Sequence, residues 1–209
     1  MTRLAAWAVI VFVGGGCAPR VVPLKGAPAP ERSLPALRIP LGHRKIVFHW
    51  DYQENSLNAK GDGAIRIASP DSARVDLFLP GGLFVGKATL IGDNLSAPNK
   101  DQVEKVLPPA AMMWAALGRL AIPALPDTVI TVDGDVLYAY VGRPAAWRVT
   151  IKGDRLMQLA RLNGGRIAEV VTRDDGGRLL YEVPGRRKLW LGITRDDEVP
   201  AFDASIWGP

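Results

Sequence analysis

The sequence predicts a mainly β protein in which one helix lies across a curved antiparallel sheet. From residue 44 onward, apolar and polar residues alternate with a period of two over many short segments, as in strands with one buried face. Turn signals rich in Gly, Asp, Asn and Pro separate these segments at regular intervals, which is typical of consecutive hairpins. Only the segment between residues 101 and 120 has a helical composition instead.

The N-terminus predicts an exported, lipid-anchored protein. Arg3, a short apolar stretch and three glycines lead to Cys17, the only cysteine of the chain. This order is typical of a secretory signal peptide, and the apolar stretch is too short to cross about 30 Å of hydrocarbon. Small residues directly before a lone cysteine favour a lipoprotein signal peptide over residues 1–16, with Cys17 lipidated, rather than an ordinary signal peptide with an incidental cysteine.

A proline-rich stretch joins this anchor to the domain. Six prolines between residues 18 and 40 disfavour helix and sheet and predict an extended tether. We therefore assign residues 17–43 to the lipidated cysteine and tether, and residues 44–209 to a single domain. Ala18, rather than Asp, follows the cysteine, which by the sorting rule of enteric-type bacteria predicts the periplasmic face of the outer membrane.

The first expected strand places Ile46, Phe48, Trp50 and Tyr52 on one face. Turns are expected between the strands, one of them at Gly61-Asp62-Gly63. The further expected strands cover residues 65–67, 74–79, 83–91, 147–152, 167–172, 179–183 and 189–193.

Two helical pieces are expected between these strands, at residues 101–107 and 109–120, divided by Pro108 and Pro109. The second piece is hydrophobic nearly all round, so it must be buried against the sheet. Its Met and Trp side chains and the aromatic residues of the first strand predict either a filled core or a cavity for acyl chains, and the residues alone leave both open. The expected lining is Phe48, Trp50, Ile65, Ile67, Val75, Leu77, Met113, Trp114 and Leu117.

The sequence supports neither an enzyme nor a metal or cofactor site. His43 and His49 have no cysteine or carboxylate nearby at metal-ligand spacing, and the Asp-Gly pairs fit hairpin turns. No nucleophile or phosphate-loop motif is present. The net charge of +5 is spread along the strands, which does not favour nucleic acid as a partner.

Three segments resemble the lipoprotein carrier and receptor family of the Lol pathway (LolA/LolB-like). They are the strand and turn Leu77-Phe78-Leu79-Pro80-Gly81-Gly82, the helix Met113-Trp114-Ala115-Ala116-Leu117-Gly118, and the late strand Arg187-Lys188-Leu189-Trp190-Leu191. The resemblance implies an unclosed antiparallel β-barrel with a small helical lid, whose cavity holds lipoprotein acyl chains received from a soluble periplasmic carrier. It also implies a membrane-facing turn, at Leu83 or Phe84 here.

These observations predict a lipid-anchored periplasmic binding protein that accepts lipoprotein acyl chains, or another hydrophobic ligand, and delivers them to the outer membrane. The alternative is a structural adaptor lipoprotein of an envelope assembly, with the same fold and no cavity.

Overall fold

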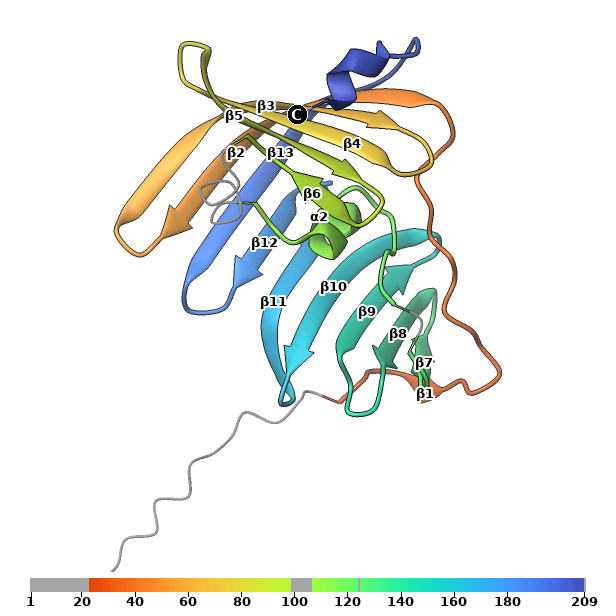
Figure 1. Ribbon diagram of the computed structural model, residues 1–209. Coiled ribbons are helices and arrows are strands. Elements are labelled where there is room, and N and C mark those ends of the chain that lie inside the picture. The colour runs from red at the N-terminus through yellow and green to blue at the C-terminus, as the bar shows by residue number, and fades with distance from the viewer. Residues whose placement is uncertain (1–22, 99–106, 124, 209) are drawn as a thin grey trace, which may run out of the picture.

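The computed structural model describes residues 23–98, 107–123 and 125–208. One antiparallel sheet of 13 strands curls around the helix α2 (Ala110–Ala116) without closing (Figure 1). The strand order is β1-β7-β8-β9-β10-β11-β12-β13-β2-β3-β4-β5-β6. The strands are β1 (Ala27–Pro28), β2 (His43–Glu54), β3 (Leu57–Ala68), β4 (Ser72–Leu79), β5 (Leu83–Ile91), β6 (Asn94–Ser96), β7 (Val129–Asp133), β8 (Val136–Val141), β9 (Trp147–Lys152), β10 (Arg155–Asn163), β11 (Arg166–Arg173), β12 (Leu179–Val183) and β13 (Arg187–Val199).

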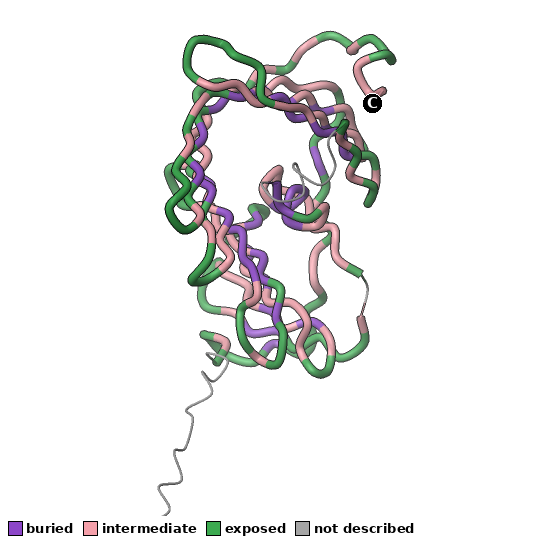
Figure 2. Tube along the Cα trace, turned by 60° about the vertical axis from the view of Figure 1, so that its left-hand side comes forward, coloured by how far each residue is buried: buried purple, intermediate pink, exposed green. Residues whose placement is uncertain are grey.

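The predicted fold class is confirmed: the molecule is an unclosed antiparallel barrel with a small helical lid. The alternation seen in the sequence determines which side chains face inward. In β2, Ile46, Phe48, Trp50 and Tyr52 are all buried, and the buried residues of the tube view lie on the inside of the curl, towards the helix (Figure 2). Several strands lie outside the ranges expected from the sequence, namely β6, β7, β8 and β10, and β13 continues beyond residue 193 to Val199.

The turn expected at Gly61-Asp62-Gly63 is wrong, because these residues lie in the middle of β3. Gly63 pairs with Phe48 and Gly61 with Trp50 on the neighbouring strand. A Cβ on Gly63 would lie closer than 3.0 Å to the Phe48 ring. One on Gly61 would lie 2.0 Å from the carbonyl oxygen of Phe78 on β4 and 2.9 Å from Cζ2 of Trp50. Gly63 therefore lets the Phe48 ring lie against the backbone of β3, and Gly61 leaves room for both the Phe78 carbonyl and the Trp50 ring.

The helix is shorter than expected. It begins after Pro109 and ends at Ala116, rather than at residue 120, and Gly118 follows with φ of +91°. Glycine adopts this left-handed conformation without a steric cost, so it ends the helix. The helical piece expected at residues 101–107 falls outside the described residues except for Leu107, which is not helical.

The described part of the proline-rich stretch lies against the domain instead of standing free of it (Figure 1). Strand β1 pairs with β7, the amide of Ala29 donates to the carbonyl of Ile130, and the amide of Leu120 donates to the carbonyl of Leu37. Ala29 and Ile39 are buried in the core. The ordered domain thus begins before residue 44, since Ala29 and Ile39 of this stretch are part of its core.

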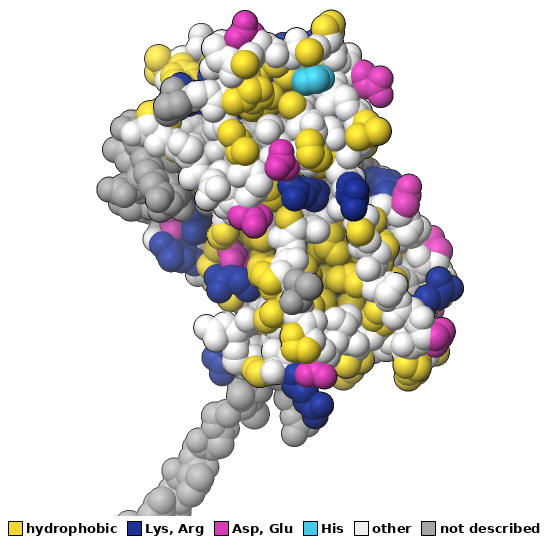
Figure 3. Space-filling model, turned by 45° about the vertical axis from the view of Figure 1, so that its right-hand side comes forward, with side chains coloured by type: hydrophobic (Ala, Val, Ile, Leu, Met, Phe, Trp, Pro, Cys, Tyr) yellow, Lys and Arg dark blue, Asp and Glu magenta, His cyan; other side chains and the backbone are white. Residues whose placement is uncertain are grey.

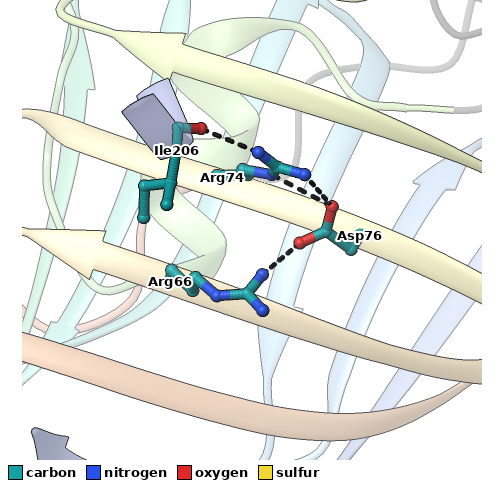
Figure 4. Close-up of polar contacts among 4 residues, drawn as sticks. All are labelled: Arg66, Arg74, Asp76 and Ile206. Carbon is teal, nitrogen blue, oxygen red and sulfur yellow. Dashed lines mark hydrogen bonds and ion pairs between the residues drawn. The ribbon is translucent and has the colours of Figure 1, made fainter. Parts of the chain in front are cut away.

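A buried carboxylate stabilises the outer face of the sheet. Asp76 of β4 is only 4% exposed, although the alternation placed it on a polar face. Its oxygens accept from Arg66 and from Arg74 Nη2, the latter at 2.8 Å, and Arg74 Nη1 also donates to the carbonyl of Ile206 at 2.8 Å (Figure 4). Ile206 belongs to the 3-10 helix η1 (Ala204–Trp207). This network attaches the C-terminal segment to β4 and accounts for the burial of the charge.

Candidate ligand-binding cavity

An apolar space lies between α2 and the concave face of the sheet. It has two adjoining parts, of about 240 Å³ and about 60 Å³. The smaller part lies under Met113 and is lined almost entirely by hydrophobic side chains of β2, β3, β4, β12 and β13. The residues that line both parts are Phe48, Ile65, Ala116, Leu117, Leu179 and Leu191.

Most of the residues predicted from the sequence to line a cavity do so. Phe48, Trp50, Ile65, Val75, Leu77, Met113 and Leu117 all contribute to its wall. Ile67 and Trp114 are instead buried in the core, at 1% and 0% exposure, and line neither part.

Trp114 has a different role from the one expected, which placed it near Phe48 or Trp50. Its Nε1 donates to the carbonyl of Gly92 at 2.6 Å, in the turn between β5 and β6, and the guanidinium of Arg119 lies 4.7 Å from the centre of its ring. The preceding residue, Met113, shares the smaller space with Phe48 and Trp50. Consecutive helical residues point about 100° apart, so one of the pair faces the cavity and the other fastens α2 to a hairpin.

The C-terminal end of α2 is held by strand β11. Arg173, the last residue of β11, donates from Nη2 to the carbonyl of Ala116 at 2.7 Å. Burial lowers the pKa of this guanidinium most, Arg155 and Arg44 lower it further, and the carboxylate of Asp196 opposes the shift. A basic group at a helix C-terminus satisfies a carbonyl that has no partner within the helix.

The mouth of the larger space is polar, and sequence reasoning missed it. Arg38, Arg44, Arg155 and Arg173 line it together with Asp154 and Asp196. Arg44, Arg155, Arg173 and Asp196 lie on four different strands, and Arg38 and Asp154 lie outside the strands. Within its own stretch of sequence, each looks like an ordinary solvated charge. In the space-filling view, basic side chains gather across the middle of one face beside hydrophobic ones (Figure 3).

The polar atoms along the apolar wall already have partners. Tyr181 of β12 lines the smaller space, and its hydroxyl donates to Oε2 of Glu169 at 2.8 Å. Burial and the Glu169 carboxylate raise the pKa of this hydroxyl well above its usual value. The tyrosine therefore contributes a neutral ring to the wall.

The predicted membrane-facing turn is exposed. Leu83, Phe84 and Val85 follow the β4–β5 turn and are 66%, 52% and 52% exposed. The Phe84 ring stacks edge-on with that of Phe78 at a centroid distance of 5.8 Å. Three consecutive exposed apolar residues at a hairpin tip are unusual for a surface in contact with water alone.

The two histidines lie outside the cavity wall. His43 contacts the ring of Phe202, and Nδ1 of His49 contacts Oδ1 of Asp62 on the outer surface. Across the part of the chain that the structure describes, no three His, Cys, Asp or Glu side chains gather in a way that could hold a metal ion. Cys17 lies outside the described residues.

The curled sheet and its helix can be compared with solved structures. The LolA superfamily protein NE2245 from Nitrosomonas europaea matches over 82% of this chain and 92% of its own, with a TM-score of 0.52 and 9% sequence identity. This chain shares the fold of a LolA superfamily protein. The fold implied by the sequence resemblance is therefore confirmed.

Weaker similarities extend beyond that LolA superfamily protein. A domain from Vibrio parahaemolyticus assigned to outer membrane lipoprotein sorting has a TM-score of 0.40 at 8% identity, covering 80% of this chain and 89% of its own. A DUF1329 family protein from Desulfovibrio piger has a TM-score of 0.39 at 8% identity, covering 80% and 90%. Neither a family model nor a curated protein matches the sequence. Among the helices described here, none is both long and apolar enough to cross a membrane.

Proposed function

We propose that this protein is a lipid-anchored, non-enzymatic binding protein of the bacterial envelope. It accepts the acyl chains of a lipoprotein, or another hydrophobic ligand, and delivers them to the outer membrane. The observation that carries the proposal is the apolar space under α2, which the described residues of the domain leave unfilled. Its size approaches the lower end of small-molecule sites, about 300 Å³. A purely structural adaptor has no need to keep such a space.

Binding is tested with the neutral fluorescent probe N-phenylnaphthylamine and full-length protein carrying Cys17→Ala, which removes the acylation site. We expect saturable binding that Leu191→Trp abolishes, because Leu191 lines both parts of the space and indole would fill it. Val129→Trp is the matched control, since Val129 is 58% exposed on β7. Absence of probe binding to the parent protein, or equal binding by the two Trp variants, would contradict the proposal.

The exposed hairpin supports the delivery step, because Leu83 and Phe84 could enter the lipid headgroup region of an outer membrane. Replacing both by Asp should slow transfer of a bound fluorescent fatty acid to vesicles at least tenfold and leave its affinity unchanged. Unchanged transfer rates would remove this turn from the mechanism.

The anchor is tested separately in cells. Wild-type protein should incorporate labelled palmitate and fractionate with the outer membrane, whereas the Cys17→Ala protein should do neither. Depletion of the protein should leave other lipoproteins at the inner membrane; normal lipoprotein sorting would rule out the receptor role and leave a carrier of another hydrophobic ligand.

A further inference from the structure

The mouth of the cavity carries more positive than negative charge. Its four arginines and two aspartates give a formal net charge of +2. Only one ion pair joins them: Arg44 Nε donates to Oδ1 of Asp196 at 3.1 Å, and Nη2 of Arg44 contacts Oδ2. Arg173 donates to a neutral carbonyl and, among the described residues, has no direct carboxylate contact, although the charge of Asp196 raises its pKa.

The remaining two arginines of the mouth are available. Arg38 and Arg155 are exposed, and within the described chain neither side chain has a hydrogen bond or an ion pair. Asp154 lies next to Arg155 in the β9–β10 turn and likewise makes no ion pair among the described residues. Burial lowers the pKa of Arg173 most, Arg155 and Arg44 lower it further and Asp196 raises it, so repulsion by the two arginines outweighs the attraction of Asp196 at this guanidinium. A negative charge placed between them would be stabilised.

The apolar wall starts directly behind these charges. Arg44 and Ile46 are neighbours on the same face of β2, and both line the larger space with Phe48, which continues into the smaller one. Along this path the lining changes from guanidinium groups to hydrophobic side chains. Such a gradient matches a molecule with an anionic head and an apolar tail, since the head meets charge-assisted donors and the tail leaves water.

We propose that the cavity takes an anionic amphiphile, with its apolar chain under α2 and its carboxylate or phosphate head at Arg38, Arg155 and Arg173. This inference rests on the proposed function and specifies the chemical class of its ligand. Carboxylate and phosphate heads share the chemistry that arginine recognises, and the two are distinguished by experiment.

The test measures displacement of N-phenylnaphthylamine from full-length Cys17→Ala protein by four ten-carbon amphiphiles. Decanoate, decyl phosphate, decanol and decylamine have the same chain and differ in the head. We expect decanoate, decyl phosphate or both to displace the probe at a concentration at least tenfold lower than decanol, with decylamine the weakest. Preference for one anion over the other identifies the head group. The advantage should shrink between 0.05 M and 0.5 M salt.

Charge variants locate the head. Arg155→Gln and Arg38→Gln should each reduce the advantage of the anions about tenfold, as expected for the loss of one charge-assisted contact, and leave decanol unaffected. Arg166→Gln is the matched control, because Arg166 is exposed at the opposite end of β11 from Arg173.

Two outcomes would overturn the inference, and they differ from a failure of the proposed function. Equal displacement by all four amphiphiles, or an anion preference that Arg155→Gln and Arg38→Gln leave intact, would remove the anionic head while the hydrophobic cavity stands. No binding of the probe or of any amphiphile would refute the cavity function itself, and the inference with it.

Discussion

The two halves of the sheet face the same helix, but one half is closely packed and the other borders the cavity. Strands β7 to β10 form a closely packed half, in which Ala139, Val149 and Leu159 are fully buried. None of β7, β8 and β9 lines either part of the cavity, and β10 reaches it only at its first two residues, Arg155 and Leu156. Strands β2 to β4, with β12 and β13, form the open half, whose inward side chains border the cavity.

The packed half is filled with the chain's own irregular segments. Strand β1 pairs with β7 and covers its edge. The hydroxyl of Thr131 on β7 donates to the carbonyl of Lys25, just before β1. The connection from α2 to β7 also packs there, since Leu125 lies beside Gly142 at the end of β8. No comparable segment of the described chain fills the open half. The contrast shows that a curled sheet does not by itself leave an empty space on its concave side. The same sheet is filled in the half where the chain places an irregular segment against it.

The largest expected effect tests this contrast with the same substitution in each half. Leu159→Ala removes a fully buried side chain and should lower the free energy of unfolding by about 3–5 kcal/mol. Leu191→Ala should cost only about 1 kcal/mol, because Leu191 is half-buried and borders existing empty space. Urea denaturation measures both. Equal losses would show that the two halves are packed alike.

A smaller effect is expected at the glycines of the open half. Gly63→Ala forces the Phe48 ring off the backbone of β3 and into the cavity, at a cost of about 1–3 kcal/mol. It should also weaken probe binding, since the displaced ring takes up cavity volume. Gly86→Ala on β5 is the control: its Cβ would meet no atom within 4 Å. If both variants unfolded and bound the probe alike, the close approach of ring and backbone would have no role in shaping the cavity.

The smallest effect concerns the hydrogen bond that fastens α2 to the β5–β6 hairpin. Trp114→Phe keeps an aromatic ring in α2 but removes the hydrogen bond to Gly92, and should cost about 1–2 kcal/mol with the orphaned carbonyl included. Trp190→Phe serves as control, because Trp190 is only half-buried. Thermal unfolding monitored by circular dichroism compares them. A larger loss for Trp190 than for Trp114 would mean that this bond does not secure the helix.

Local patterns in the sequence account for most of the fold and part of the site. Alternation identified the inward face of β2 because a strand has only two faces. The interpretation of Gly61-Asp62-Gly63 as a turn was wrong, because glycines that favour a turn also permit close contact inside a strand. Only the pairing of β3 with β2 distinguishes a turn from a strand here. The arginines of the mouth could not be found in this way: Arg44, Arg155 and Arg173 come together only through the curl of the whole sheet.

The short strands at the two edges of this open sheet affect its tendency to associate with other chains at high protein concentration. An uncapped edge exposes unpaired backbone groups that can recruit another chain and start aggregation. Here one edge is β6, with three residues, and the other is β1, with two, of which Pro28 has no amide hydrogen to offer. Strand β6 pairs with only Thr89–Ile91 of β5, and β1 pairs with only Thr131 and Val132 of β7, so these two short strands cover part of each edge. Where they lie, a second copy of the chain finds too little template to pair with, and the barrel stays unclosed there without recruiting a neighbour.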